Sequence, residues 1–256
     1  MIWKINMLEK FMGGSKEAKQ GIEAERELIE YFSNSKDVLV SCAQKLSIKI
    51  PNSFVVIKPV NRIKCDLMIK GEFTICISVK TVTDASFHQL DRRWLDVWKT
   101  VLNMPEDIYK ILLDSILRKA KDPKAVFILP KDRDKISKFI KDNLSIILKE
   151  IFIRDEEDLR ILAIWDKRDD ILCMFNIQDV ISFFIKQPIS FSDEGIIKIG
   201  KYITIQRKGG NGSRIKKPKI DPTHPGNQLQ FKFKPLEFMN DARKLMNNCC
   251  LNITQT

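Results

Sequence analysis

Hydrophobic and polar residues follow two different periods along this chain, and the period separates helical segments from extended ones. Residues 16–32 have a period of three to four, which predicts an amphipathic helix. The positions on its apolar face are Gly21, Glu25, Leu28, Ile29 and Phe32. A glutamate therefore lies on the side of this predicted helix that faces the protein interior.

Three β-rich runs follow the helix, at residues 54–60, 65–70 and 73–80, with turn residues between them. The last two runs alternate apolar and polar residues. Pairing them as a hairpin with all apolar side chains on one face fixes the register, because a slip of one residue would expose that face. Ile69 then pairs with Ile75, and the hairpin closes through a three-residue turn.

The rest of the chain continues to alternate between helical and extended segments. We predict helices at 91–102, 105–120, 136–151 and 236–246, strands at 125–129, 159–165, 171–175, 196–199, 202–206 and 228–234, and a helix between 175 and 185. The expected fold class is α/β or α+β, with a mixed sheet flanked by helices in one domain over residues 1–256.

Composition agrees with a folded, soluble protein. Hydrophobic residues make up 44% and charged residues 30% of 256 positions, which is close to globular averages. The uncharged apolar runs are far shorter than the ~18 residues that cross a bilayer. We therefore expect no membrane association, and the charged N-terminal segment is unlike a secretion signal. The six cysteines are expected to be reduced, in a cytoplasmic protein.

Basic residues are concentrated in one part of the chain, whose formal net charge is +11. Residues 198–234 hold ten Lys and Arg and a single acid, or +9, whereas the other 219 residues carry 34 bases and 32 acids. A concentrated positive patch is typical of a polyanion partner. A solvated basic face and an anionic membrane surface are the alternatives. Nucleic acid is the commonest large polyanion, and we expect residues 196–234 to form a basic segment that recognises it.

Three chemically active side chains meet on the polar face of the predicted hairpin. The register places Asp66 directly opposite Ser78, with Lys80 as the diagonal neighbour. A carboxylate can hold Mg²⁺, which prefers oxygen ligands and lowers the pKa of a bound water. A lysine can orient that water or neutralise charge in the transition state. The trio indicates metal-assisted phosphodiester hydrolysis, in which Ser78 hydrogen-bonds within the metal shell.

A second acid is expected, because one carboxylate seldom suffices for such a metal site. Glu25 is the first candidate, since it lies on the inward face of the preceding helix. Asp84 and Asp91 are the alternatives.

The spacing D-x11-S-x-K, from Asp66 to Lys80, resembles the PD-(D/E)xK nuclease motif. Cys65 stands in place of the proline, and Ser78 in place of the usual acid. The segment GIEAERELIEYF is similar to the G-x3-E-x2-L helix of archaeal Holliday-junction resolvases, in which the glutamate belongs to the metal site. This resemblance implies a restriction-endonuclease-like catalytic core at residues 16–120, with Glu25 beside Asp66.

Segments further along the chain resemble type II restriction endonucleases. They are TDASFHQLDRRWLDVW after the catalytic strand, MPEDI at the start of the next helix, and YITIQRKGGNG with NQLQFKFKP towards the C-terminus. The glycines of the RKGGNG loop permit positive φ and a close approach of backbone to a ligand.

Arginine, lysine and amide side chains near this loop can bond base edges in the major groove. The candidate base readers are Gln206, Arg207, Lys208, Asn211, Gln228 and Gln230. A second set, His88, Gln89, Arg92 and Arg93, is expected to open the helix after Lys80, where a helix N-terminus would approach phosphates. Pairing of the two arginines with Asp91 and Asp96 is the alternative.

The function expected from these features is that of a type II restriction enzyme, a sequence-specific, Mg²⁺-dependent endodeoxyribonuclease. A homodimer would match a palindromic site. A cognate DNA methyltransferase is expected in the same system, without a stable complex. One alternative is a structure-specific nuclease of the Holliday-junction resolvase type. Another is a non-catalytic DNA-binding protein with a decayed site, because Ser78 stands where an acid is usual.

Overall fold

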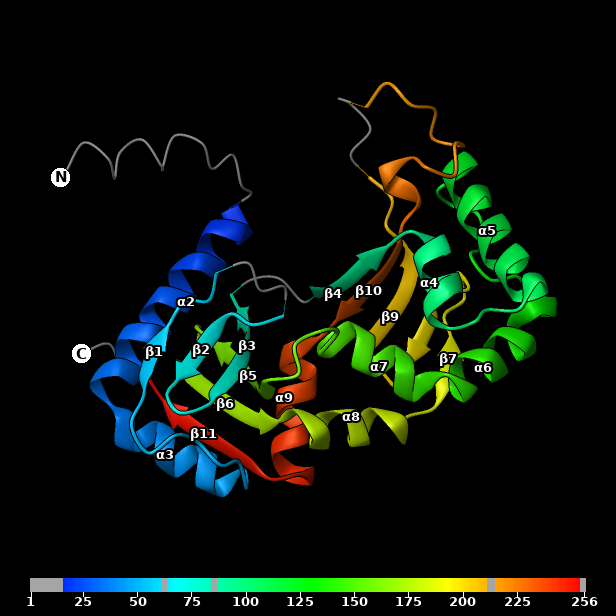
Figure 1. Cartoon of the computed structure of the whole chain (residues 1–256). Helices are drawn as coiled ribbons and strands as arrows, with labels where there is room; N and C mark the ends of the chain where they lie inside the picture. The colour runs from blue at the N-terminus through cyan, green and yellow to red at the C-terminus, as the bar shows by residue number, and fades with distance from the viewer. Residues whose placement is uncertain (1–15, 61–63, 84–86, 211–214, 254–256) are drawn as a thin grey trace.

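Two β-sheets, each covered by helices, organise the chain (Figure 1). The computed structural model describes residues 16–60, 64–83, 87–210 and 215–253. Sheet A has the strand order β1-β2-β3-β5-β6-β11, and sheet B the order β4-β10-β9-β8-β7. The α+β class with a mixed sheet and flanking helices is confirmed, with sheet A as the mixed sheet; the second sheet was not predicted.

Sheet A contains the predicted hairpin. Its strands are β1 (Val55–Ile57), β2 (Leu67–Lys70), β3 (Thr74–Val82), β5 (Leu159–Asp166), β6 (Ile171–Asn176) and β11 (Asn248–Asn252). In the part of sheet A that the structure describes, β3 and β5 run parallel to each other, and the other neighbouring strands, including β2 and β3, pair antiparallel. Ile69 pairs with Ile75, so the register derived from alternation is confirmed.

Helices α2 (Lys16–Asn34) and α3 (Lys36–Lys45) cover one face of sheet A (Figure 1). Ala24, Leu28 and Phe32, one turn apart on α2, are fully buried in a core with Leu67 and Ile77 of the hairpin. The opposite face of sheet A packs against α8 (Ile177–Ile185) and α9 (Pro235–Leu245).

Sheet B is antiparallel throughout. Its strands are β4 (His88–Arg93), β7 (Ile189–Phe191), β8 (Ile197–Ile199), β9 (Ile203–Arg207) and β10 (Leu229–Phe233). The helices around it are α4 (Leu95–Val101), α5 (Glu106–Lys121), α6 (Arg133–Asp142) and α7 (Leu144–Phe152), with short turns η1 (Pro130–Asp132) and η2 (Pro225–Asn227). Alternate residues of β9 are buried, and so is β10 apart from Lys232; the ring of Phe231 lies 4.8 Å from that of Trp98.

The predicted helix at 91–102 begins too early, because residues 88–93 form strand β4. Leu90 is an extra residue opposite β10, where the pairing shifts between Phe231 and Lys232. This bulge turns both Leu90 and Asp91 inward and breaks the alternation that marks a strand.

Other boundaries also differ from the prediction. Residues 125–129 are buried in part but form no strand, and the helix predicted at 136–151 is divided at Asn143, whose side-chain amide donates to the carbonyl of Phe139. Strands β7 and β11 were not predicted; β11 is asparagine-rich and is stabilised by its pairing with β6.

The six cysteines form three disulfides, Cys42–Cys249, Cys65–Cys76 and Cys173–Cys250. The expectation of free thiols was therefore wrong. The partners of β11 lie on α3 and β6, which are brought together only by the fold. Within the described residues, no helix combines the length and the hydropathy that a membrane-crossing segment needs.

Candidate functional site

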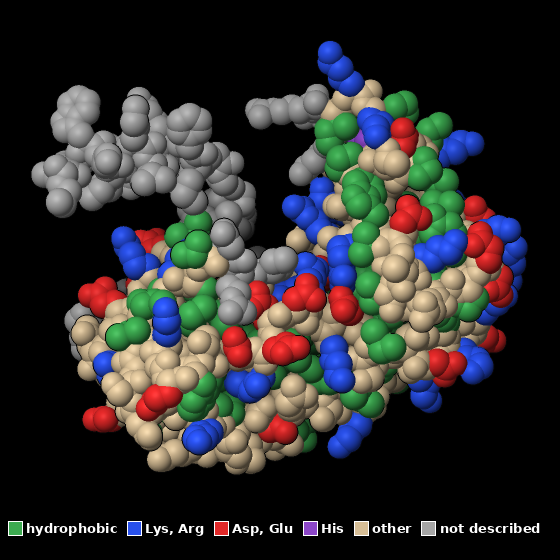
Figure 2. All heavy atoms as spheres, in the orientation of Figure 1, with side chains coloured by type: hydrophobic (Ala, Val, Ile, Leu, Met, Phe, Trp, Pro, Cys, Tyr) green, Lys and Arg blue, Asp and Glu red, His purple; other side chains and the backbone are tan. Residues whose placement is uncertain are grey.

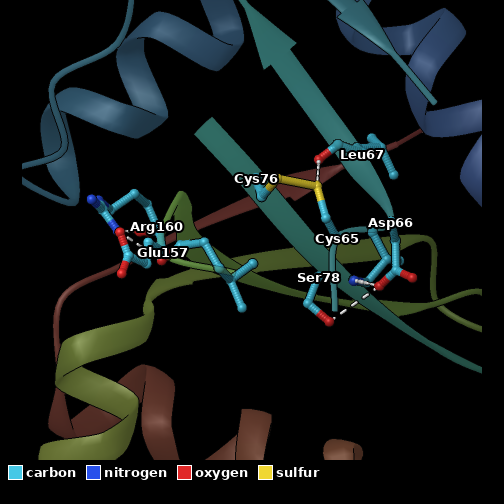
Figure 3. The surroundings of a disulfide bond; sticks show 9 residues. Cys65, Asp66, Leu67, Cys76, Ser78, Glu157 and Arg160 are labelled. Atoms are coloured by element: carbon cyan, nitrogen blue, oxygen red, sulfur yellow. Dashed lines mark hydrogen bonds between the residues drawn. A yellow bond between two sulfur atoms is a disulfide. The ribbon is translucent and has the colours of Figure 1, made fainter. Parts of the chain in front are cut away.

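Asp66, Ser78 and Lys80 lie together where β2 and β3 separate. The backbone N–H of Asp66 donates to the carbonyl of Ile77 at 2.9 Å and ends the pairing of the two strands. Figure 3 shows the side chains of Asp66 and Ser78 pointing toward each other, beside the Cys65–Cys76 disulfide. The predicted register thus places the three polar residues at one strand edge.

Two hydrogen bonds and one ion pair from β3 hold one oxygen of the Asp66 carboxylate. Oδ2 accepts hydrogen bonds from the hydroxyl of Ser78 at 3.1 Å and from the backbone N–H of Val79 at 2.6 Å. The ammonium of Lys80 lies 3.7 Å from the same oxygen. Lys80 also donates to Ser78 Oγ and to the carbonyl of Val79, both at 2.9 Å. These contacts fix the orientation of all three side chains.

The exposure of this group leaves room for a ligand. The side chains of Asp66 and Lys80 are 26% and 18% exposed, while Ser78 is buried behind them. Oδ1 of Asp66 accepts no hydrogen bond from the residues that the structure describes. A free carboxylate oxygen beside hydroxyl and carbonyl oxygens is an all-oxygen donor set, which fits a hard cation such as Mg²⁺.

Glu25 is not in direct contact with this group. Its carboxylate forms an ion pair of 2.8 Å with Lys58, directly after β1, and its side chain is 19% exposed. Because β1 pairs antiparallel with β2, Lys58 is next to the end of β2 that leads into Asp66. On the same helix, Glu27 pairs with Lys167 beyond β5. The described residues contain no cluster of three metal-binding side chains.

Asp91 is buried in an ionic cluster rather than open to a metal. Its side chain is 4% exposed and contacts Arg93 Nε at 2.7 Å, the guanidinium of Arg154, and Lys64 at 3.9 Å. Arg93 also pairs with Glu150 at 2.8 Å, so both its Nε and one terminal nitrogen are directed into the protein. Three cations already neutralise Asp91. The other alternative acid, Asp84, lies outside the described residues.

Lys64 is a buried residue of this site that the sequence did not reveal. It lies two residues before Asp66 and donates to the carbonyls of Leu90 at 2.6 Å and Ile151 at 2.7 Å. Burial lowers its pKa to about 8; Asp91 opposes that shift, while nearby cations add to it. Its partners come from β4 and α7, so no local pattern marks it.

His88 lies at the start of β4, next to the hairpin of β2 and β3. Burial is the main cause that lowers the pKa of His88 to about 4, and the charge of Lys80 adds to it. A hydrogen bond with the backbone of Thr81 raises the pKa and offsets part of this shift. The imidazole is therefore neutral at pH 7. Its buried Nε2 has no hydrogen-bond partner among the described residues.

His88→Gln is expected to reduce the acid sensitivity of the fold. A folded-state pKa of about 4 lies below the unfolded value of 6.5, so the unfolded chain binds the proton first. His88 therefore costs up to about 3 kcal/mol of stability as the pH falls from 6.5 to 4. Urea unfolding at several pH values should show a steeper loss for the native chain. Parallel curves would contradict this assignment.

Four predicted DNA-binding residues meet on one face of sheet B, although they come from distant segments. Gln230 on β10 pairs with Arg92 on β4 and with Gln206 on β9, so these three lie side by side across neighbouring strands. The amide of Gln230 also donates to Gln89 Oε1 at 2.9 Å. The expectation that His88, Gln89, Arg92 and Arg93 open a helix was wrong, because all four lie on β4.

The remaining predicted base readers surround the end of β9. Arg207 donates to Asn227 Oδ1 at 2.7 Å and is half-buried, which lowers its pKa. Burial and the charges of Arg92 and Arg207 lower the pKa of Lys208, so these three cations are neighbours. The backbone N–H of Lys208 donates to the carbonyl of Gln228 at 2.9 Å.

The glycine loop after β9 has the backbone that its sequence predicts. Gly209 and Gly210 have φ of 66° and 62°, in the left-handed region that favours glycine. Asn211 and the third glycine lie outside the described residues.

The molecule is hollowed between the part built on sheet A and the part built on sheet B (Figure 2). Lys and Arg side chains gather on the wall of this hollow over β4 and β10. In Figure 1, the start of β4 lies next to the end of β3, between the strands of sheet A and the rest of sheet B. The charge of Lys80 acts on His88, the first residue of β4, so the Asp66 group lies close to the start of this strand.

The model of the R.HinP1I restriction endonuclease family matches residues 62–239 of the chain. Among solved structures, the restriction endonuclease MspI in complex with its cognate DNA is similar, with a TM-score of 0.45 and 11% sequence identity. That similarity covers 81% of this chain and 83% of MspI. No curated protein matches the sequence.

Proposed function

Because the chain belongs to the R.HinP1I restriction endonuclease family and is thus a type II site-specific deoxyribonuclease, we propose that it hydrolyses double-stranded DNA at the Asp66 group. The observation that carries this assignment is the hydrogen-bonded set of Asp66, Ser78 and Lys80 at the edge of β3. Family membership also favours a restriction enzyme over a structure-specific resolvase.

The residues of this set have separate roles in the proposed mechanism. Asp66 would hold Mg²⁺ through the oxygen that its neighbours leave free. When bound, Mg²⁺ acts as a Lewis acid and lowers the pKa of a coordinated water. Ser78 and the N–H of Val79 keep the Asp66 carboxylate oriented. Lys80 donates a hydrogen bond to the carbonyl of Val79, which positions its ammonium. Its positive charge would stabilise the negative charge that develops on the phosphate in the transition state.

Incubation of plasmid DNA with the protein and Mg²⁺ tests the proposed activity. Discrete fragments with a constant sequence at their ends support it, and sequencing of those ends gives the recognition site. Retained DNA binding without any cutting would instead support a DNA-binding protein with a decayed site.

We expect Glu25 to act as the second acid, with Glu25→Gln lowering the cleavage rate about 10- to 100-fold. Glu25 lies beside the end of β2 that leads into Asp66, and the charge of Mg²⁺ calls for a second carboxylate. Rates at several Mg²⁺ concentrations measure the effect, which should be partly offset by excess metal.

Two control variants separate a metal role of Glu25 from a structural one. Lys58→Met removes the ion-pair partner but keeps the carboxylate, and Glu27→Gln changes a carboxylate on the same helix that pairs with Lys167. Equal loss of activity in Glu25→Gln and Lys58→Met would show that Glu25 acts through its ion pair with Lys58 and does not bind the metal.

Base reading is assigned to the row formed by Arg92, Gln230 and Gln206. Arginine and glutamine side chains can bond guanine and adenine edges respectively, and three of them side by side present a pattern that a short DNA sequence can match. Arg93 is left out of this set, because it is held by Asp91 and Glu150.

Gln230→Ala is expected to weaken cognate binding by about 1–3 kcal/mol while random-sequence DNA is bound almost as before. Lys216→Gln, on an exposed part of the basic segment, should weaken binding to both DNAs alike. Titrations with cognate and random duplexes measure both effects. If the two variants behaved alike, the row would contribute only to general affinity.

We further propose a homodimer, since a twofold axis matches a palindromic site. A cognate methyltransferase would protect the host DNA in the same cytoplasm. The three disulfides do not support a cytoplasmic location, because disulfides are rare in a reducing compartment such as the cytoplasm.

A further inference from the structure

The polar face of sheet B extends beyond the Arg92 row into a groove. A second row of paired residues lies two positions from the Arg92 row along β9 and β10, and it crosses all five strands. Its members are Gln89, Lys232, Thr204, Lys198 and Ser190. Side chains alternate along a strand, so both rows lie on one face. A groove of about 870 Å³ covers the second row from β10 to β7 and reaches Gln206 of the first.

The charged side chains that line this groove are all positive. Four lysines line it and no Asp or Glu does. Two of them, Lys201 and Lys234, are paired with Asp241 and Glu237 of α9 at 2.7 and 2.6 Å. The other two, Lys198 and Lys232, have no carboxylate partner among the described residues.

The rest of the groove lining suits a sugar-phosphate chain. Ser190 and Thr204 provide hydroxyl donors in the row of the lysines. The aromatic ring of Phe87, a residue that is 40% exposed, forms an apolar wall of the groove, and the ammonium groups of Lys232 and Lys234 lie over it. Hydroxyls and ammonium groups bind phosphate oxygens and carry no sequence information.

We propose that this groove binds the sugar-phosphate backbone of DNA that flanks the recognition site, with Lys198 and Lys232 as its phosphate contacts. The inference rests on the proposed function, because the Arg92 row must read the bases. The second row spans about 19 Å over four strand spacings, which equals five to six base steps along a duplex. Flanking DNA of that length is needed to fill the groove.

The test compares two duplexes that carry the mapped recognition site, one with about 2 and one with about 10 flanking base pairs on each side. The double variant Lys198→Gln and Lys232→Gln should lose tenfold or more in affinity for the long duplex at about 0.1 M salt. Its salt dependence on the long duplex should fall by about two units. The short duplex should show a much smaller loss. Fluorescence anisotropy in metal-free buffer measures binding without cleavage.

The matched control is Lys141→Gln with Lys45→Gln, which removes two exposed lysines on α6 and α3, neither of which lines the groove. Its affinity should change equally little for both duplexes. Hydroxyl-radical footprinting of the native protein gives a second measurement, and protection of the flanking sugars is expected.

Equal losses on the short and the long duplex, or no loss on either, would overturn the proposed groove, as would unprotected flanking sugars. Failure of the proposed function differs from these outcomes, because the native protein would then neither cut DNA nor prefer any sequence.

Discussion

Asp66→Ala is expected to lower the rate of cognate DNA cleavage by a factor of about 1,000 or more, because loss of a metal ligand removes several kcal/mol of transition-state stabilisation. Lys80→Met should cost about 100- to 1,000-fold, since it removes one preorganised charge. The two residues share contacts with Ser78, so their effects are not expected to add. Single-turnover cleavage rates measure both losses.

Variants of the same hairpin provide the controls. Lys70→Met removes an exposed lysine at the far end of β2 and should leave cleavage unchanged. Ser78→Ala removes both the hydrogen bond to Asp66 and the acceptor for Lys80, but keeps the carboxylate and the ammonium, and should give an intermediate loss. Near-native cleavage by Asp66→Ala or Lys80→Met, with an unchanged circular dichroism spectrum, would refute the assigned site.

Asp91→Ala is expected to reduce the free energy of unfolding by about 3–5 kcal/mol, which is a large part of the stability of a domain. The change leaves Arg93, Arg154 and Lys64 without the carboxylate that they surround, where β4, α7 and the segment before β2 meet. Chemical denaturation measures the loss. Asp91→Asn, which keeps the shape of the side chain, allows the measurement if the alanine variant does not fold.

Asp96 provides a matched control near the same strand, because its carboxylate is exposed and accepts a hydrogen bond from Tyr109. Asp96→Ala should lower stability by less than about 1 kcal/mol. The folded fraction of Asp91→Asn should cleave DNA at close to the native rate per molecule. A stable but inactive Asp91→Asn protein would instead identify Asp91 as part of the metal site.

The hairpin of β2 and β3 could be predicted from the sequence because the pattern that specifies it is local. Alternating apolar residues on two adjacent runs permit a single register, and that register brings Asp66 to Ser78 and Lys80 across one turn. The helix that carries Glu25 was predicted for the same reason, although its buried face is centred on Ala24 and Leu28. Local periodicity also predicted the backbone of the glycine loop.

Contacts between distant segments were decided only by the tertiary structure. The bulge at Leu90 breaks the alternation of β4, so the sequence pattern did not predict this strand. It therefore did not predict that Arg92, Gln230 and Gln206 form a row in a second sheet. The burial of Lys64 and Asp91 likewise depends on partners from other elements.

The sequence by itself determined the class of fold, the hairpin with Asp66, Ser78 and Lys80, and the positive charge of the C-terminal third. The tertiary structure decided which charges face solvent, which cysteines meet, and which base-reading candidates share a surface. The physical reason is the range of the interactions. Side-chain alternation acts between neighbours in the chain, whereas burial and ion pairing depend on segments that only folding brings together.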